Sequence, residues 1–260
     1  MSSSAKAIEM VDPRGDDAPS SYHFAEYAGC FAALRRRSAA RVCVLDIEGD
    51  GREPIPMPAV DLDDRARQGL ARLLPSLLCG EESAAITFAR ESIRFGSPAD
   101  GDIRAALKGI AREEAIHERL LRGLSAALPP APDLEEIRSN ARRFYVAMAR
   151  SGEVSDHFAR IAELDSCVCV LLSAFLRSRA ARCDPVGALF RRIRQDEVRH
   201  VATSRRYLDA MGTPTESVMS ASEWVRPELV RLLVPVGGAF DDIGVDPEAL
   251  FHRLQRGRDR

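Results

Sequence analysis

Apolar side chains recur every three or four residues from about residue 61 onward, which is the spacing of one face of an α-helix. Prolines, glycines and polar residues divide this pattern into five long segments and two shorter ones. The predicted helices cover 61–95, 101–128, 133–152, 153–183, 184–212, 216–234 and 247–256. The pattern therefore predicts an all-α fold.

Some positions in these segments say more about helix geometry. Pro75 lies inside the first segment and predicts a kink or a restart there. The segment 153–183 is apolar on nearly every side, which predicts a central helix. In the fifth segment we predict Asp184 as the N-cap, Pro185 as the first helical residue and Gly212 as the C-terminal cap.

The chain before residue 61 has weaker patterns. Residues 1–20 have the composition of a flexible tail, and 21–260 are predicted to form a single domain. Residues 22–39 have a pattern compatible with a helix, and 41–47 have strand-like composition.

Composition excludes several classes of protein. The net charge of −2 gives no electrostatic reason to bind nucleic acid or an anionic membrane. No apolar run approaches the roughly 18 residues of a membrane span, and the N-terminus lacks the apolar centre of a signal peptide. The six cysteines show no CxxC spacing. We therefore predict a cytoplasmic protein with reduced thiols.

Two pairs of charged residues interrupt the apolar faces of the predicted helices. Glu114 and His117 share a face with Ile110, and Glu197 and His200 lie three residues apart in the same way on the fifth long helix. Each pair directs a carboxylate and an imidazole toward one spot inside the predicted core.

Two further carboxylates lie in apolar surroundings on the other long helices. On the first helix Glu81 is nearer the centre of the apolar stripe than Glu82, and we favour Glu81. On the central helix Glu163 and Asp165 are alternatives, and we favour Glu163 because its interval to Glu197 resembles the interval from Glu81 to the earlier pair.

Four carboxylates in a helical core need compensation, because an unpaired buried charge is strongly unfavourable. Two divalent cations would neutralise them, and two neutral imidazoles would complete a shared site. Mixed carboxylate and imidazole donors favour iron or manganese over calcium, and the absence of cysteine argues against structural zinc. The sequence therefore predicts a two-metal site built from Glu81, Glu114, His117, Glu163, Glu197 and His200.

This ligand order over about residues 65–212 resembles the ferritin-like di-iron carboxylate proteins, which use one Glu from each of two helices and Glu-x-x-His from each of two others. The resemblance implies a four-helix bundle with a long crossover, here with extra N-terminal and C-terminal segments. The stretch DEVRH, 196–200, is similar to a motif of the oxygen-activating members. By that resemblance Asp196 orients His117, and Glu113 orients His200 in the same way.

The resemblance implies a non-haem di-iron oxygenase or oxidase acting on a small organic metabolite, in biosynthetic tailoring. Its cofactors would be two Fe ions cycling between Fe²⁺ and Fe³⁺, with Mn as an alternative and O₂ as co-substrate. An electron donor such as a ferredoxin or a flavin reductase would support turnover, and the family also allows a homodimer. The alternative is a ferroxidase or another iron-handling protein without an organic substrate.

Small residues around Glu163 predict room for a substrate. Ala159, Ser166 and Cys167 share its helix face, and Ser204 on the fifth long helix would add polar lining. We therefore predict a cavity at this position.

Overall fold

A computed structural model describes residues 53–94, 101–150 and 153–256. Helices and their connecting segments make up these ranges, and no strand occurs within them. The all-α prediction is therefore confirmed for this part of the chain. The predicted tail at 1–20, the possible helix at 22–39 and the strand-like segment at 41–47 lie outside the described residues.

The long helices follow the predicted order closely. Two short 3₁₀ turns, η2 (Ala180–Arg182) and η3 (Val234–Val236), lie among them. The α-helices are α2 (Asp64–Arg94), α3 (Gly101–Ala126), α4 (Leu134–Met148), α5 (Val154–Phe175), α6 (Asp184–Ala210), α7 (Thr215–Leu233), α8 (Gly237–Asp242) and α9 (Pro247–Arg256). Helix α2 passes through Pro75 without a break, so no restart occurs there. Helix α5 ends at Phe175, eight residues before the predicted end at 183.

The ends of α6 differ in how well they were predicted. The N-cap is Cys183, without a side-chain cap, so Asp184 already belongs to the first helical turn and the predicted N-cap is wrong by one residue. Gly212 adopts a φ of 63°, a conformation that favours glycine. Its amide donates to Asp209 O at 3.0 Å, and Thr213 N donates to Leu208 O at 3.0 Å. These paired bonds form a Schellman motif, which confirms Gly212 as a terminating residue.

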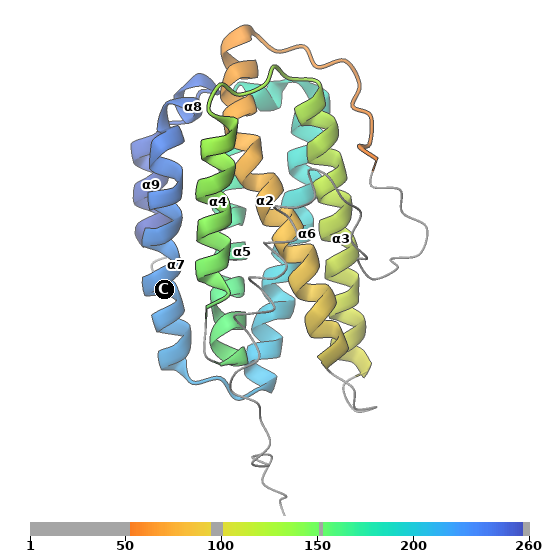
Figure 1. Cartoon of the computed structure of the whole chain (residues 1–260), viewed down its shortest axis with the longest axis vertical. Helices are drawn as coiled ribbons and strands as arrows, with labels where there is room; N and C mark the ends of the chain where they lie inside the picture. Colours follow the sequence, from red (N-terminus) through yellow and green to blue (C-terminus); the bar gives the residue numbers. More distant parts are fainter. Residues whose placement is uncertain (1–52, 95–100, 151–152, 257–260) are drawn as a thin grey trace, which may run out of the picture.

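The helices pack in two antiparallel pairs with a connecting helix between them (Figure 1). Helix α2 packs on α3, α5 packs on α6, and α3 also contacts α6. Helix α4 returns the chain along the long axis, so α3 and α5 run in the same direction (Figure 1). Helices α7 and α9 add a further layer against α5, and α8 packs on α2. The face of α5 opposite the first pair is therefore covered by protein.

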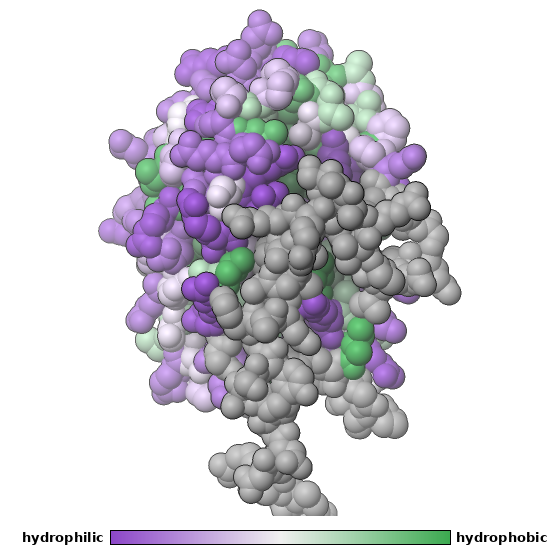
Figure 2. Space-filling view, viewed as in Figure 1, coloured by the Kyte–Doolittle hydropathy of each residue, from purple (hydrophilic) through white to green (hydrophobic). Residues whose placement is uncertain are grey.

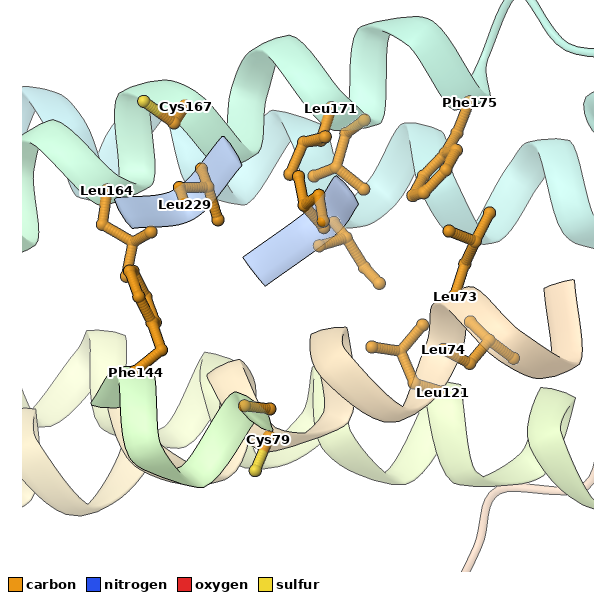
Figure 3. Packing of buried hydrophobic residues seen from close by; sticks show 14 of the residues in the cluster. Leu73, Leu74, Cys79, Leu121, Phe144, Leu164, Cys167, Leu171, Phe175 and Leu229 are labelled. Carbon is orange, nitrogen blue, oxygen red and sulfur yellow. The ribbon is translucent and has the colours of Figure 1, made fainter. Parts of the chain in front are cut away.

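One continuous core joins these layers, and Figure 3 shows part of it. Leu74 of α2, Leu121 of α3 and Phe175 of α5 are at most 2% exposed. The side of the molecule in Figure 2 is mainly hydrophilic over the coloured residues, as expected when apolar side chains are directed inward. None of the described helices combines the length and the apolar character needed to cross a membrane.

Candidate metal centre

Four helices each place one buried carboxylate at the middle of the bundle, and two of them add a histidine one turn later. Each of these side chains is at most 6% exposed: Glu81, Glu114, His117, Asp165, Glu197 and His200. Helices α3 and α6 follow an amphipathic pattern, so their Glu and His residues face inward together with the surrounding apolar residues.

The first half of the cluster gathers around His117. Glu81, Glu114, His117 and Glu197 each offer one ligand atom, and these atoms all lie within 4.8 Å of one another. Nδ1 of His117 lies 3.2 Å from Glu81 Oε2, 3.6 Å from Glu114 Oε2 and 3.7 Å from Glu197 Oε1. An imidazole nitrogen among three carboxylates is a donor set that could hold a divalent cation. The choice of Glu81 over Glu82 agrees with this arrangement, because Glu82 is not among these four.

The second half gathers around His200. Its Nδ1 lies 2.9 Å from Glu114 Oε1 and 3.6 Å from Glu197 Oε1, without the geometry of a hydrogen bond. Asp165 Oδ2 is also buried without a hydrogen bond. Buried polar atoms normally have partners, so these two unpartnered atoms, each with a lone pair to offer, fit a ligand such as a metal ion. Glu114 reaches both histidines through its two oxygens and lies between the two halves.

Each histidine also contacts another carboxylate through Nε2, the ring nitrogen that faces away from the cluster. His117 Nε2 lies 3.0 Å from Asp196 Oδ2, and His200 Nε2 lies 2.8 Å from Glu113 Oε2. These are the two partnerships that the sequence predicts. A carboxylate that accepts from Nε2–H leaves Nδ1 with its lone pair facing the cluster, which is the tautomer that a metal ligand requires.

Arg199 links the two outer carboxylates. Its Nη2 lies 2.6 Å from Asp196 Oδ1 and donates to Glu113 Oε1 at 2.8 Å. Arg192 adds a hydrogen bond to Asp196 Oδ2 at 2.8 Å. Burial acts against ionisation of Asp196, but the hydrogen bonds from Arg192, His117 and Arg199 hold its pKa well below the usual range. Sequence reasoning did not single out Arg199, although it lies inside the DEVRH stretch.

Without a metal, protons hold the cluster together. Burial opposes protonation of the histidines, yet the surrounding carboxylates raise the pKa of His117 to about 11 and that of His200 to about 12. Burial, then the charge of Glu114, raises the pKa of Glu81 to about 8. The metal-free cluster therefore retains protons that a bound cation would displace.

The stabilisation that a metal gives to the fold should increase with pH. All three folded-state pKa values lie above the unfolded ones, so the metal-free fold loses stability as pH rises, first through about 8 for Glu81 and later through about 11 and 12 for the histidines. A cation binds better as those protons leave. Thermal unfolding with and without Co²⁺ should show a larger rise in Tm at about pH 8 than at about pH 6. An equal rise at both would contradict proton displacement from this cluster.

The structure does not bring Glu163 into the cluster. Glu163 forms an ion pair with Arg226 of α7, and Ser222 Oγ donates to Glu163 Oε1 at 3.3 Å. Arg226 also donates to Leu254 O of α9 at 2.7 Å. Glu163 therefore ties α5 to the outer layer, and Asp165 takes the inward position that we predicted for Glu163.

The cavity predicted beside Glu163 stays a prediction, and the structure gives the surroundings of its lining residues. Ser166 Oγ donates to Ala162 O at 2.7 Å and accepts from Arg205 Nη2 at 3.4 Å. Cys167 is fully buried, within range of the charges of Arg226 and Glu163. Ala159 is also buried in the core, on the helix face that Glu163 shares.

The inward side of α5 carries larger residues instead. The ring of Phe88 lies 6.5 Å from the rings of both Phe158 and His200. Ser204, one turn beyond His200, is fully buried, and its Oγ has no hydrogen-bond partner. Of the predicted lining residues, Ser204 is therefore the one whose position still suits the centre.

Comparison with known proteins gives no relative for this chain: no family model, curated protein or solved structure matches it. The helices and the cluster therefore define the protein only as a helical protein with a buried carboxylate and histidine site that could bind metal.

Proposed function

We propose that this protein is a ferritin-like, O₂-dependent di-iron oxidase or oxygenase that acts on a small organic molecule. One observation carries the proposal: the Glu-x-x-His pairs of α3 and α6 face each other, with His200 Nδ1 2.9 Å from Glu114 Oε1 across the helix interface. Glu81 and Asp165 supply the carboxylates of the other two helices. This arrangement resembles the ligand plan of carboxylate-bridged di-iron bundles, with Asp in place of one Glu.

The donor set indicates how two ions would be shared. Glu81 and His117 would hold one ion, Asp165 and His200 the other, and Glu114 and Glu197 would lie between them. Four carboxylates balance two divalent cations, which removes the cost of burying the acids. When bound, such an iron pair supplies the redox chemistry that reduces O₂. The same oxygen and nitrogen donors also fit Mn²⁺.

The chain's own residues orient the ligands and exclude water. Asp196 and Glu113 fix the two imidazoles, and Arg199 holds both carboxylates in place. Phe88 and Phe158 give the His200 side an apolar wall, which suits O₂ and a non-polar part of a substrate better than a hydrated ion. A ferredoxin or flavin reductase would return electrons between turnovers.

The path of the chain also favours this class. Ferritin-like bundles join their two helix pairs by a long crossover, and α4 has that place between α3 and α5 (Figure 1). Helices α7 and α9 cover the outer face of α5. An added layer of this kind is suited to a separate enzyme more than to a subunit whose outer faces build a cage.

A second candidate is a ferroxidase or other iron-handling protein. The aromatic rings of Phe88 and Phe158 favour it, because they fill space beside His200 that an organic substrate would need.

Iron and oxygen titrations test the proposal. Protein supplied with Fe²⁺ under argon should bind about two ions per chain, following its ligand count. On mixing with O₂, oxidation should stop once the bound ions have reacted, and organic substrates should emerge oxygenated or dehydrogenated. Sustained Fe²⁺ oxidation, with many Fe³⁺ ions deposited per chain, would replace the oxygenase by the iron-handling protein. If the protein bound no iron although its ligands were intact, both the oxygenase and the iron-handling proposals would be refuted.

A further inference from the structure

The hydroxyl of Tyr145 reaches the α2 backbone directly before the candidate ligand Glu81. Tyr145 belongs to α4 and is 9% exposed. A Cβ atom at Gly80 would lie 2.6 Å from Tyr145 Oη, closer than two such atoms can approach. Glycine inside a helix is normally destabilising relative to alanine. The glycine at this position therefore makes room for the phenol next to the metal cluster.

A row of aromatic rings continues from Tyr145 to the outer layer. The rings of Tyr145 and Phe144 have centroids 5.1 Å apart, and those of Phe144 and Trp224 lie 6.1 Å apart and nearly parallel, at 18°. Both separations are those of rings in contact. Trp224 is partly exposed on α7, with Arg160 Cζ 4.6 Å from its ring centroid. Figure 3 shows Phe144 inside the core, directed toward Leu164 of α5.

Oxidisable groups stand at the two ends of this row. Tyrosine and tryptophan lose an electron more readily than other aromatic side chains, and Phe144 fills the space between them. Burial, then the charges of Cys79 and Glu81, keeps the pKa of Tyr145 well above its ordinary value. The phenol therefore remains protonated and can act as a donor of an electron together with a proton.

Building on the proposed iron centre, we propose that Tyr145, Phe144 and Trp224 form a one-electron path that conducts oxidising equivalents from the centre to the surface of α7. The path would act when O₂ has oxidised the centre and no substrate is present. It would protect the core around Phe88 and Phe158 from oxidation.

Each electron transfer along this path is accompanied by a proton transfer. Tyr145 would give one electron to the oxidised centre and its phenolic proton to Glu81, the carboxylate whose charge acts most strongly on the phenol. Trp224 then returns one electron to Tyr145, which recovers its proton. Trp224, which is partly exposed, would release its indole proton to solvent. A one-electron reductant of the ferredoxin or flavin class, with a proton from water, restores Trp224, and no covalent bond between heavy atoms forms or breaks.

Metal-free protein tests the path without iron. Flash photolysis with a ruthenium tris-bipyridine oxidant in solution should oxidise Trp224, and its signal is unambiguous because the chain has one tryptophan. In wild type the tryptophan radical should come to equilibrium with a tyrosyl radical, with both populated, because a path from Tyr145 to Trp224 must also conduct in reverse; complete conversion to the tyrosyl radical would overturn the outward direction. In Tyr145→Phe that tyrosyl signal should be lost and the tryptophan radical should persist. Tyr207→Phe, a buried tyrosine of α6 off the path, should behave as wild type.

Equal decay of the tryptophan radical in wild type and in Tyr145→Phe would overturn the path, and this result would not depend on the iron chemistry.

A second experiment uses Fe²⁺-loaded protein that is exposed to O₂ without substrate and then frozen for EPR. Wild type should show a tryptophan radical that is lost in Trp224→Phe, where the oxidising equivalent stays on Tyr145 as a tyrosyl radical, and that variant should accumulate oxidised core residues by mass spectrometry. The absence of both effects in protein that does react with O₂ would overturn the protective role. Protein that passes the photolysis test but binds no iron would refute the iron centre and leave the electron path standing.

Discussion

Replacing Glu114 with alanine is expected to abolish binding of both metal ions. Its two carboxylate oxygens approach the two histidines separately, 3.6 Å from His117 Nδ1 and 2.9 Å from His200 Nδ1. A residue shared between the two halves of the cluster would serve both ions, so its loss should weaken the binding of each of them. Anaerobic titration with Co²⁺ or Fe²⁺ should fall from about two ions per chain to none at concentrations that saturate wild type.

Glu118→Ala provides the matched control. Glu118 belongs to the same helix, lies one residue after His117 and pairs with Arg122 near the surface. Its removal should leave both ions bound. Circular dichroism should show unchanged helix content in both variants, since neither substitution introduces a helix breaker. Two ions bound with wild-type affinity by folded Glu114→Ala would show that this carboxylate does not bridge the halves.

The parts of the centre that could be predicted are those on helices with one clear apolar stripe. On α3 and α6 the pairs Glu114–His117 and Glu197–His200 interrupt such stripes, so their direction followed from periodicity alone. Glu81 stands on its stripe in the same way. The carboxylates behind the histidines followed from the DEVRH resemblance.

On α5, the acid that faces inward could not be predicted from periodicity. This helix is apolar nearly all round, because one face contacts α6 and another is covered by α7. Glu163 and Asp165 are two residues apart and point in nearly opposite directions, so each occupies an apolar environment in the sequence. The choice depends on Arg226 of α7, which compensates Glu163 but lies 63 residues further along the chain. Interval matching therefore selected the acid that pairs with Arg226 and not Asp165, the buried acid beside the cluster.

The contacts of Tyr145 were missed for a related reason. Nothing in the local pattern of α4 distinguishes a tyrosine that packs on α2 from one that fills the core. The signal was Gly80, a glycine in mid-helix beside a candidate ligand. The role of this glycine depends on which helix packs against α2, and that packing belongs to the tertiary structure.

Paired variants of the two acids on α5 should separate their roles. Asp165→Ala should reduce the metal content from about two ions to about one, because it removes the carboxylate that accompanies His200. The ion beside Glu81 and His117 has its own ligands and should remain. Metal analysis after anaerobic loading and gel filtration measures the difference.

Glu163→Ala should keep both ions and lose stability instead. It leaves the guanidinium of Arg226 without its carboxylate partner at a site where the two side chains are 14% and 12% exposed. Loss of a charged partner in such surroundings costs roughly 1–3 kcal/mol in the free energy of unfolding. Glu163→Gln, which retains an oxygen for Ser222, should lose less. Urea unfolding of metal-free protein measures the free energy of unfolding of both Glu163 variants against wild type. If Glu163→Ala lost an ion while Asp165→Ala kept two, α5 would have to be rotated so that Glu163 faced the histidines.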